Sequence, residues 1–199
     1  MEMHVEMQRT IAKAIRLKGP GLHTGSQTEV TIKPAEAATG IVFVRVDQTP
    51  PVRIPATIEF IQRGTGGRQT SLGNGKVHVR TVEHLMATFH GLGIDNAVVE
   101  ISGDELPGFD GSAKEFSERI QAAGLKTQDE PKEYLCVTEP IYLDENGRSL
   151  IVLPNPDGLK LSYTLSYHHR DLKDQFFSAE VTPKMFEREL APARTFCLR

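Results

Sequence analysis

Hydrophobic and polar residues alternate in short segments along the first part of the chain, and this pattern predicts strands. The predicted strands cover residues 8–17, 29–34, 41–46 and 95–101, with Val52–Ile54 as at most a short edge strand. Asn74-Gly75 favours a hairpin turn that joins residues 68–72 to residues 76–79.

A helical period replaces this alternation in two places. Val82, Leu85, Met86 and Phe89 have the i, i+3, i+4, i+7 spacing of one buried helix face, with Thr81 as the expected N-cap and Gly91 with Gly93 as the stop. A second helix is predicted over residues 113–123, with Phe116 and Ile120 toward the core, Ser112 as N-cap and Gly124 at its end. The order strands, helix, strand, helix predicts an α+β domain whose sheet carries both helices on one face.

The predicted elements of the second part of the chain begin with the same order, strands followed by a helix. The polar stretch from Lys126 to Lys132 contains Pro131 and is interpreted as a linker, which gives a first domain over 1–127, a linker over 128–132 and a second domain over 133–199. Strands are predicted at 134–137, 141–143, 149–154, 159–167 and 176–181, and a helix at 183–190. A second helix and a closing strand are missing, so we expect an incomplete domain, because the chain is truncated or because a partner completes it.

Charge and composition narrow the function classes. The 199 residues carry a net charge of −3, which offers no basic field for a nucleic-acid backbone. The N-terminus has acidic residues where a signal peptide has basic ones, and no apolar run reaches membrane-spanning length. We therefore expect a soluble, cytoplasmic protein that would meet a lipid substrate from the water side. Cys136 and Cys197 are read as reduced thiols, with a single long-range disulfide left open.

The chemistry centres on Glu83 and His84, in the first turn of the first predicted helix. A carboxylate beside an imidazole there could supply a general base and one metal ligand, although such a pair is more often a solvated helix end. His23 lies in a glycine-rich loop, where lining a pocket and bonding to the local backbone are both open. The glycine-rich stretch 63–76 does not have the spacing of a phosphate-binding loop.

Five short motifs occur in the order and at about the spacing of one family. They are Gly21-Leu22-His23-Thr24-Gly25, Thr81-Val82-Glu83-His84-Leu85, Gly91-Leu92-Gly93-Ile94-Asp95-Asn96, Phe109-Asp110-Gly111-Ser112-Ala113 and Ala193-Arg194-Thr195-Phe196. With them the chain, nearly all of it from Gln8 on, resembles the zinc-dependent UDP-3-O-acyl-N-acetylglucosamine deacetylases of lipid A synthesis. The resemblance implies two similar two-layer α+β domains, each a sheet with two helices, facing each other across an active site, the second incomplete in this chain.

The resemblance also implies a role for individual residues. His84 matches a zinc ligand, and Glu83 matches the general base that takes a proton from the zinc-bound water. Thr195 matches the hydroxyl that helps to hold the oxyanion. Leu22 and Phe196 match positions near the acyl and sugar part of the pocket, and Tyr167 matches, more loosely, an aromatic contact to uracil. The implied cofactor is Zn²⁺, the implied substrate a UDP-linked acylated amino sugar, and we expect a monomer.

The chain lacks several residues that the family uses to bind and act with its metal. A hydrolytic zinc usually takes three protein ligands and a water, and the family's other His and Asp ligands, its general-acid histidine and a lysine lie beyond Thr195 and are absent. His78 and His90 lie six residues from His84, off its helix face, and the residue pair 168–169 is read as surface or nucleotide-side histidines. Asp110 is read as a capping or loop-bracing residue.

These absences lead to the expectation that the fragment alone is inactive. The alternative function is a non-catalytic sugar-nucleotide binding or regulatory module on the same scaffold. A fusion to a second enzyme downstream is a third possibility that this sequence does not address.

Overall fold

A computed structural model describes residues 5–63, 68–166 and 173–195. The chain divides into two compact units. The first contains the residues up to Lys132 together with those from Phe186 onward, and the second is Glu133–Met185.

A mixed five-stranded sheet forms the frame of the first unit. Its strand order is β2-β3-β8-β4-β5; β4 and β8 run parallel, and the other neighbours are antiparallel. β2, β3 and β8 alternate buried with more exposed residues, so that one face of the sheet joins a core, whereas β4 is buried at four residues in succession. Their bounds are β2 (Ile15–Pro20), β3 (Gln27–Pro34), β4 (Ile41–Arg45), β5 (Val52–Pro55) and β8 (Ala97–Ser102).

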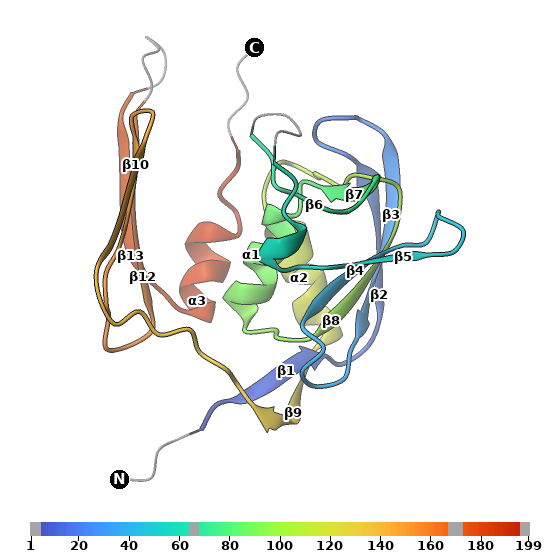
Figure 1. The fold of residues 1–199 in the computed structure, drawn as a ribbon. Coiled ribbons are helices and arrows are strands. Elements are labelled where there is room, and N and C mark those ends of the chain that lie inside the picture. Colours follow the sequence, from blue (N-terminus) through green and yellow to red (C-terminus); the bar gives the residue numbers. More distant parts are fainter. Residues whose placement is uncertain (1–4, 64–67, 167–172, 196–199) are drawn as a thin grey trace. The chain divides into compact units, whose positions relative to one another are not determined.

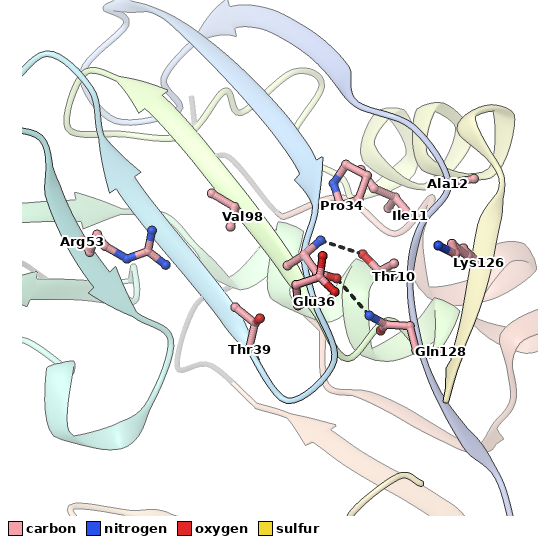
Figure 2. A pocket seen from close by; sticks show the side chains of 11 residues that line it. Thr10, Ile11, Ala12, Pro34, Glu36, Thr39, Arg53, Val98, Lys126 and Gln128 are labelled. Atoms are coloured by element: carbon pink, nitrogen blue, oxygen red, sulfur yellow. Dashed lines mark hydrogen bonds between the residues drawn. The ribbon is translucent and has the colours of Figure 1, made fainter. Parts of the chain in front are cut away.

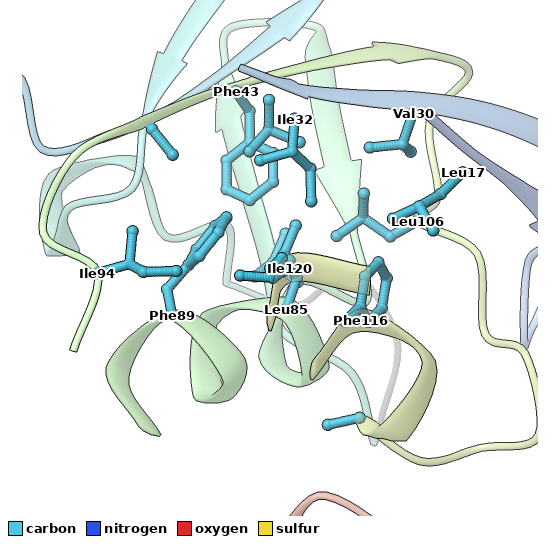
Figure 3. Close-up of a cluster of buried hydrophobic side chains, with 14 of the residues drawn as sticks. Leu17, Val30, Ile32, Phe43, Leu85, Phe89, Ile94, Leu106, Phe116 and Ile120 are labelled. Carbon is cyan, nitrogen blue, oxygen red and sulfur yellow. The ribbon is translucent and has the colours of Figure 1, made fainter. Parts of the chain in front are cut away.

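Two helices, α1 (Glu83–Leu92) and α2 (Lys114–Ala123), lie on the same side of this sheet (Figure 1). Their apolar faces meet the inner face of the sheet in a single cluster, in which Phe89 and Ile120 from the helices pack toward Phe43 and Ile32 from the strands (Figure 3). The α+β class and the placement of both helices on one face are therefore confirmed. Gly93, at φ 69°, ends α1 in the left-handed conformation expected of a helix stop.

The predicted hairpin forms and precedes α1, with its turn at Gly75-Lys76, one residue later than the expected Asn74-Gly75. It joins β6 (Ser71–Asn74) to β7 (Val77–Arg80), with Leu72 opposite Val79. A short 3-10 helix (Ile58–Phe60) precedes it.

The strand predicted over 8–17 is two strands in two different sheets. β1 (Met7–Ile11) pairs with β9 (Leu125–Pro131), whereas β2 pairs with β3. The expected linker over 128–132 was therefore largely wrong, because most of it belongs to β9. This strand is almost wholly exposed, so its sequence is as polar as that of a linker.

The C-terminal segment belongs with the first unit and not with the second domain expected over 133–199. The helix expected over 183–190 consists of α3 (Pro183–Met185) and a π-helix (Phe186–Leu190). Phe186 is buried against Gly91 of α1, where a Cβ would lie 2.3 Å from its ring. The amide of Ala113 donates to the carbonyl of Ala191 at 3.0 Å, which fixes this segment beside the start of α2.

The second unit contains two antiparallel hairpins. One pairs β10 (Ile141–Glu145) with β11 (Arg148–Val152), and the other pairs β12 (Leu159–Leu165) with β13 (Gln175–Val181). The strand expected at 134–137 does not form. Many large apolar side chains of the hairpins are exposed, among them Ile141, Leu143, Leu150, Ile151, Tyr163 and Phe176.

Candidate active site

Glu83 and His84 occupy the first turn of α1 and are both partly buried. The amide of Thr70 donates to Glu83 Oε2 at 3.0 Å, so the carboxylate is held against the segment that precedes β6. A carboxylate at a helix N-terminus is also favoured by the helix dipole. The pair is thus presented from a rigid element, with Glu83 in a defined orientation.

Thr81, just before α1, does not have the capping role that was predicted for it. It was predicted as the N-cap, but the N-cap is Val82, without a side-chain capping bond, so that prediction was wrong. Thr81 instead has φ 58° and is 2% exposed. Its hydroxyl lies 3.0 Å from Glu105 Oε1 and 3.4 Å from Gln69 Oε1.

Glu105, which the sequence analysis missed, is the centre of this part of the molecule. It is 1% exposed and lies in the loop between β8 and α2. Its Oε1 accepts from the amide of His23 at 2.8 Å and from Thr81, and its Oε2 accepts from the amide and the hydroxyl of Thr24 at 2.8 and 2.6 Å. Burial by itself raises the pKa of Glu105, but the bonds from Thr24, His23 and Thr81 outweigh it and lower the pKa below its usual value.

The loop with Leu22 and His23 is shaped around this carboxylate. The amide of Gly21 donates to the carbonyl of Ser26 at 2.9 Å, and a Cβ on Gly21 would lie 2.2 Å from Glu105 Oε2. Leu22 packs beside Gly108, where an added Cβ would lie 2.7 Å from the Leu22 side chain. The side chain of His23 is exposed, and its backbone amide makes the bond to Glu105.

Thr195 contacts the loop that carries Glu105, residues 105–112. Its amide donates to the carbonyl of Gly111 at 2.9 Å, and its methyl group would lie 3.3 Å from a Cβ on Gly111. Arg194 Nε donates to the carbonyl of Asp110 at 2.8 Å.

Asp110 braces this loop as expected. Its Oδ1 accepts from the amide of Ser112 at 3.1 Å and from the Ser112 hydroxyl at 2.6 Å, and that hydroxyl accepts from the amide of Lys114 at the start of α2. The bond from the Ser112 hydroxyl lowers the pKa of Asp110. The loop-bracing interpretation of Asp110 is thus confirmed.

Several of the expected site residues are therefore linked through one loop, residues 105–112. Leu22 contacts it at Gly108, Thr195 contacts it at Gly111, and Thr81, two residues before Glu83, bonds to it at Glu105. Tyr167, Phe196 and the histidines 168 and 169 lie outside the described residues.

These residues do not make a complete metal site. Within residues 5–63, 68–166 and 173–195, no three His, Cys, Asp or Glu side chains converge as ligands. His78 Nε2 lies 3.6 Å from Asp104 Oδ2, and Asp104 also pairs with Arg80. His90 lies exposed in the last turn of α1. One imidazole, that of His84, falls short of the three protein ligands of a hydrolytic zinc.

A cavity of about 530 Å³ is elsewhere, on the outer face of the sheet. Val98, which alternates with the buried Ala97 and Val99, lines it together with Arg53, Glu36 and Lys126 (Figure 2). Thr10 and Gln128 close one side by bonding to the backbone of Ala35. Because the helices cover the opposite face, this cavity is not part of the Glu83–His84 site. In the part of the chain that is described, none of the helices has the length and apolar character needed to cross a membrane.

Comparisons with known proteins agree with the motifs. Residues 8–199 match the model of the family described as "LpxC: UDP-3-O-acyl N-acetylglycosamine deacetylase". A UDP-3-O-acyl-N-acetylglucosamine deacetylase of Anaeromyxobacter dehalogenans is 43% identical over 96% of this chain and 61% of its own length. Proteins of the same name from Pseudomonas entomophila and Legionella pneumophila are 44% and 41% identical over 95% of this chain and 62% of theirs.

The chain thus spans about three fifths of the length of these relatives. The match to the family model covers nearly every residue from Gln8 on, including all five motifs. The chain therefore belongs to the LpxC family of UDP-3-O-acyl N-acetylglycosamine deacetylases.

Proposed function

We propose that the whole protein hydrolyses the N-acetyl group of a UDP-3-O-acyl-N-acetylglucosamine, a step of lipid A synthesis. The family match over residues 8–199 is the observation that carries this proposal. The position of Glu83 and His84 in the first turn of α1 supports it, because side chains there are held by a helix and still reach solvent.

In this proposal Glu83 is the general base. Its carboxylate takes the proton of the water that attacks the acetamide carbonyl, while the Thr70 amide keeps the side chain in place. The Thr195 hydroxyl, on the segment fixed at Gly111, donates to the oxyanion that forms. Leu22 contributes apolar surface to the substrate pocket, and it is 39% exposed and so available for contact.

We further propose Zn²⁺ as the cofactor, with His84 as one of its ligands. The described residues hold no complete ligand set, so the remaining ligands would come from the rest of the whole protein. In the same way, the two hairpins of Glu133–Met185 would belong to a second α+β layer that the whole protein completes. The chain of residues 1–199 is accordingly expected to be inactive alone.

The experiment that tests this function measures acetate release from UDP-3-O-acyl-N-acetylglucosamine by the whole protein. We expect turnover that a chelator abolishes and added Zn²⁺ restores, and no turnover from residues 1–199. Binding of the UDP-sugar without turnover would favour the non-catalytic module instead. Turnover by residues 1–199 alone would overturn the expected need for further ligands.

The Glu83→Gln variant tests the general base. Glutamine keeps the volume of the side chain and an oxygen that can accept from the Thr70 amide, but it cannot take a proton. We expect kcat to fall by about 10²- to 10⁴-fold, the usual contribution of a general base. The control is Glu115→Gln, a carboxylate in the first turn of α2, which should leave kcat unchanged. A loss of less than about tenfold in Glu83→Gln would contradict the role.

A further inference from the structure

The four hydrogen bonds of Glu105 connect three segments that are distant in sequence. His23 and Thr24 lie in the loop after β2, Thr81 lies just before α1, and Glu105 itself lies in the loop before α2. Backbone contacts run beside these bonds: Gly21 is bridged to Pro107, and the amide of Leu106 donates to the carbonyl of Arg80 at 3.2 Å. The carboxylate is therefore the point at which the Leu22 loop and the entry to the Glu83–His84 helix are fixed to each other.

Four hydrogen bonds offset the burial of the Glu105 carboxylate, which is 1% exposed, and keep its ionised form favoured. Each of the four donors is neutral, so the carboxylate depends on the whole set, because a buried carboxylate without its hydrogen bonds is expensive to keep ionised. Thr81 adds a φ of 58°, which costs a β-branched residue about 1–3 kcal/mol. Strained residues of this kind cluster at sites where the geometry serves a function.

We propose that Glu105 is a positioning residue for the deacetylation, which fixes the Leu22 loop and the start of α1 in the relative placement that the reaction needs. This inference rests on the proposed function. Glu105 acts through other residues: through the amides of His23 and Thr24 on the substrate pocket, and through Thr81 on Glu83, two positions further along the chain.

Only a carboxylate satisfies this set of donors. Oε1 and Oε2 each face one backbone amide, and a backbone amide cannot turn away or accept a bond. In Glu105→Gln, whichever way the amide group is turned, its NH₂ opposes the amide of His23 or that of Thr24. The variant keeps the volume of the side chain and loses one of the two loop contacts.

The test is steady-state kinetics of the whole protein with Glu105→Gln, Thr81→Val and Gly21→Ala. In Glu105→Gln we expect a rise in KM and a fall in kcat that lower kcat/KM by about 10²-fold, the loss that a misplacement of about 1 Å can cause. Thr81→Val removes the bond from the Thr81 hydroxyl to Glu105, together with its longer contact to Gln69 Oε1, and leaves the amides of His23 and Thr24 bonded to Glu105, so kcat should fall with KM unchanged. The control is Glu100→Gln, whose carboxylate pairs with Lys33 on the outer face of the sheet and should leave both constants unchanged.

Gly21→Ala tests the same contact from the opposite side. The new Cβ would displace the carboxylate, with Glu105 itself unaltered. We expect Gly21→Ala to reproduce the rise in KM, and the double variant with Glu105→Gln to be no worse than the more severe single variant, because both changes remove one interaction. Additive losses would overturn the inference.

Hydrogen exchange on the same variants separates positioning from general stability. The amides of His23 and Thr24 should exchange faster in Glu105→Gln, while the core strand β8 should keep its protection. If Glu105→Gln does not fold, Thr81→Val carries the test, and an unchanged kcat overturns the inference. If the wild type is active and a folded Glu105→Gln has unaltered kcat and KM, the inference is also overturned. The proposed function then remains intact. An inactive wild type overturns the proposed function itself.

Discussion

Asp47 shows how a single carboxylate can make the stability of this fold depend on pH. Arg45 donates to it twice, from Nε to Oδ1 at 2.9 Å and from Nη2 to Oδ2 at 2.7 Å. The hydrogen bonds from Arg45 outweigh burial and lower the pKa of Asp47 from 3.8 to about 2. Arg45 is itself 7% exposed and also donates to the carbonyl of His78, so this pair links β4 to β7.

The sign of the pH effect follows from the lowered pKa. Stabilisation by Asp47 is complete above about pH 4 and is lost as the pH falls toward 2, because the folded state holds the ionised form more tightly. Asp47 is partly exposed, so we expect a contribution of about 1 kcal/mol, the upper range for ion pairs in contact with water.

Asp47→Asn should therefore be less stable than the wild type at pH 6 and nearly equal to it at pH 2. Urea unfolding at a series of pH values measures the difference in the free energy of unfolding. Asp129→Asn, on the exposed strand β9, is the charge-matched control. A difference that stays constant from pH 6 to pH 2 would show that the Arg45 pair does not carry the effect.

Residue roles were proposed from the sequence only where a motif marked them. Glu83 and His84 were found because they stand in a motif and at the start of a helical period. Glu105 lies between Asp104 and Leu106 in a loop, where an acidic residue usually faces solvent, and two of its four donors are backbone amides 82 and 81 residues away. Backbone donors leave no trace in residue type, so no pattern in the sequence pointed to its burial.

The contact between α1 and the segment from Phe186 is the clearest relation between elements. A glycine inside a helix normally costs about 1 kcal/mol relative to alanine, so replacing it is usually favourable. At Gly91 the added Cβ would lie 2.3 to 2.6 Å from three atoms of the buried Phe186 ring. The glycine is needed because it lets the ring approach the helix backbone.

Gly91→Ala should consequently destabilise the first unit by about 1–3 kcal/mol, the usual range for overpacking a core. Chemical unfolding followed by circular dichroism measures the change. In the background of Phe186→Ala the same substitution should be neutral or stabilising, since the ring is gone. A stabilising Gly91→Ala in the wild-type background would contradict the close contact.

Helices and strands were predicted well where burial gave the sequence a hydrophobic period. They were predicted poorly where the pairing with a partner strand decided the bounds of a strand. The periods of α1 and α2 are set by core contacts, and both helices form as expected. The sequence over 8–17 gives no sign of the change of partner strand: β2 buries alternate residues, whereas β1 buries Thr10 and Ile11 in succession, and the two strands pair with different partners. β9 is exposed on nearly every residue, so burial left no mark on its sequence.

At the scale of the whole molecule, the second unit is an insertion into the first. Lys132 and Phe186, which border the insertion, both contact the C-terminal end of α1: Lys132 Nζ lies 3.4 Å from the carbonyl of Gly93, and the Phe186 ring packs on Gly91. The sequence predicted two domains in series, because hydrophobic patterning does not show that a chain returns to an earlier core.

A chain in which a flexible linker of about eight residues replaces residues 133–185 should therefore fold. Such a linker spans about 16 Å, which is enough for two attachment points on one end of a helix. We expect cooperative thermal unfolding and protected amides in α1. The control ends at Lys132 and lacks Phe186 and Ala191, both buried, and should be less stable. Equal stability of the two chains would show that the returning segment adds nothing to the first unit.

The close approach of Gly21 to Glu105 also limits how this family can evolve. Because the carboxylate bonds to the backbone amides of His23 and Thr24, a change of side chain at position 23 leaves these bonds in place. Any larger residue at position 21 collides with the carboxylate, and a smaller residue at position 105 leaves a space that the glycine does not fill. Over evolutionary time positions 21 and 105, which are 84 residues apart, should therefore change together or stay fixed.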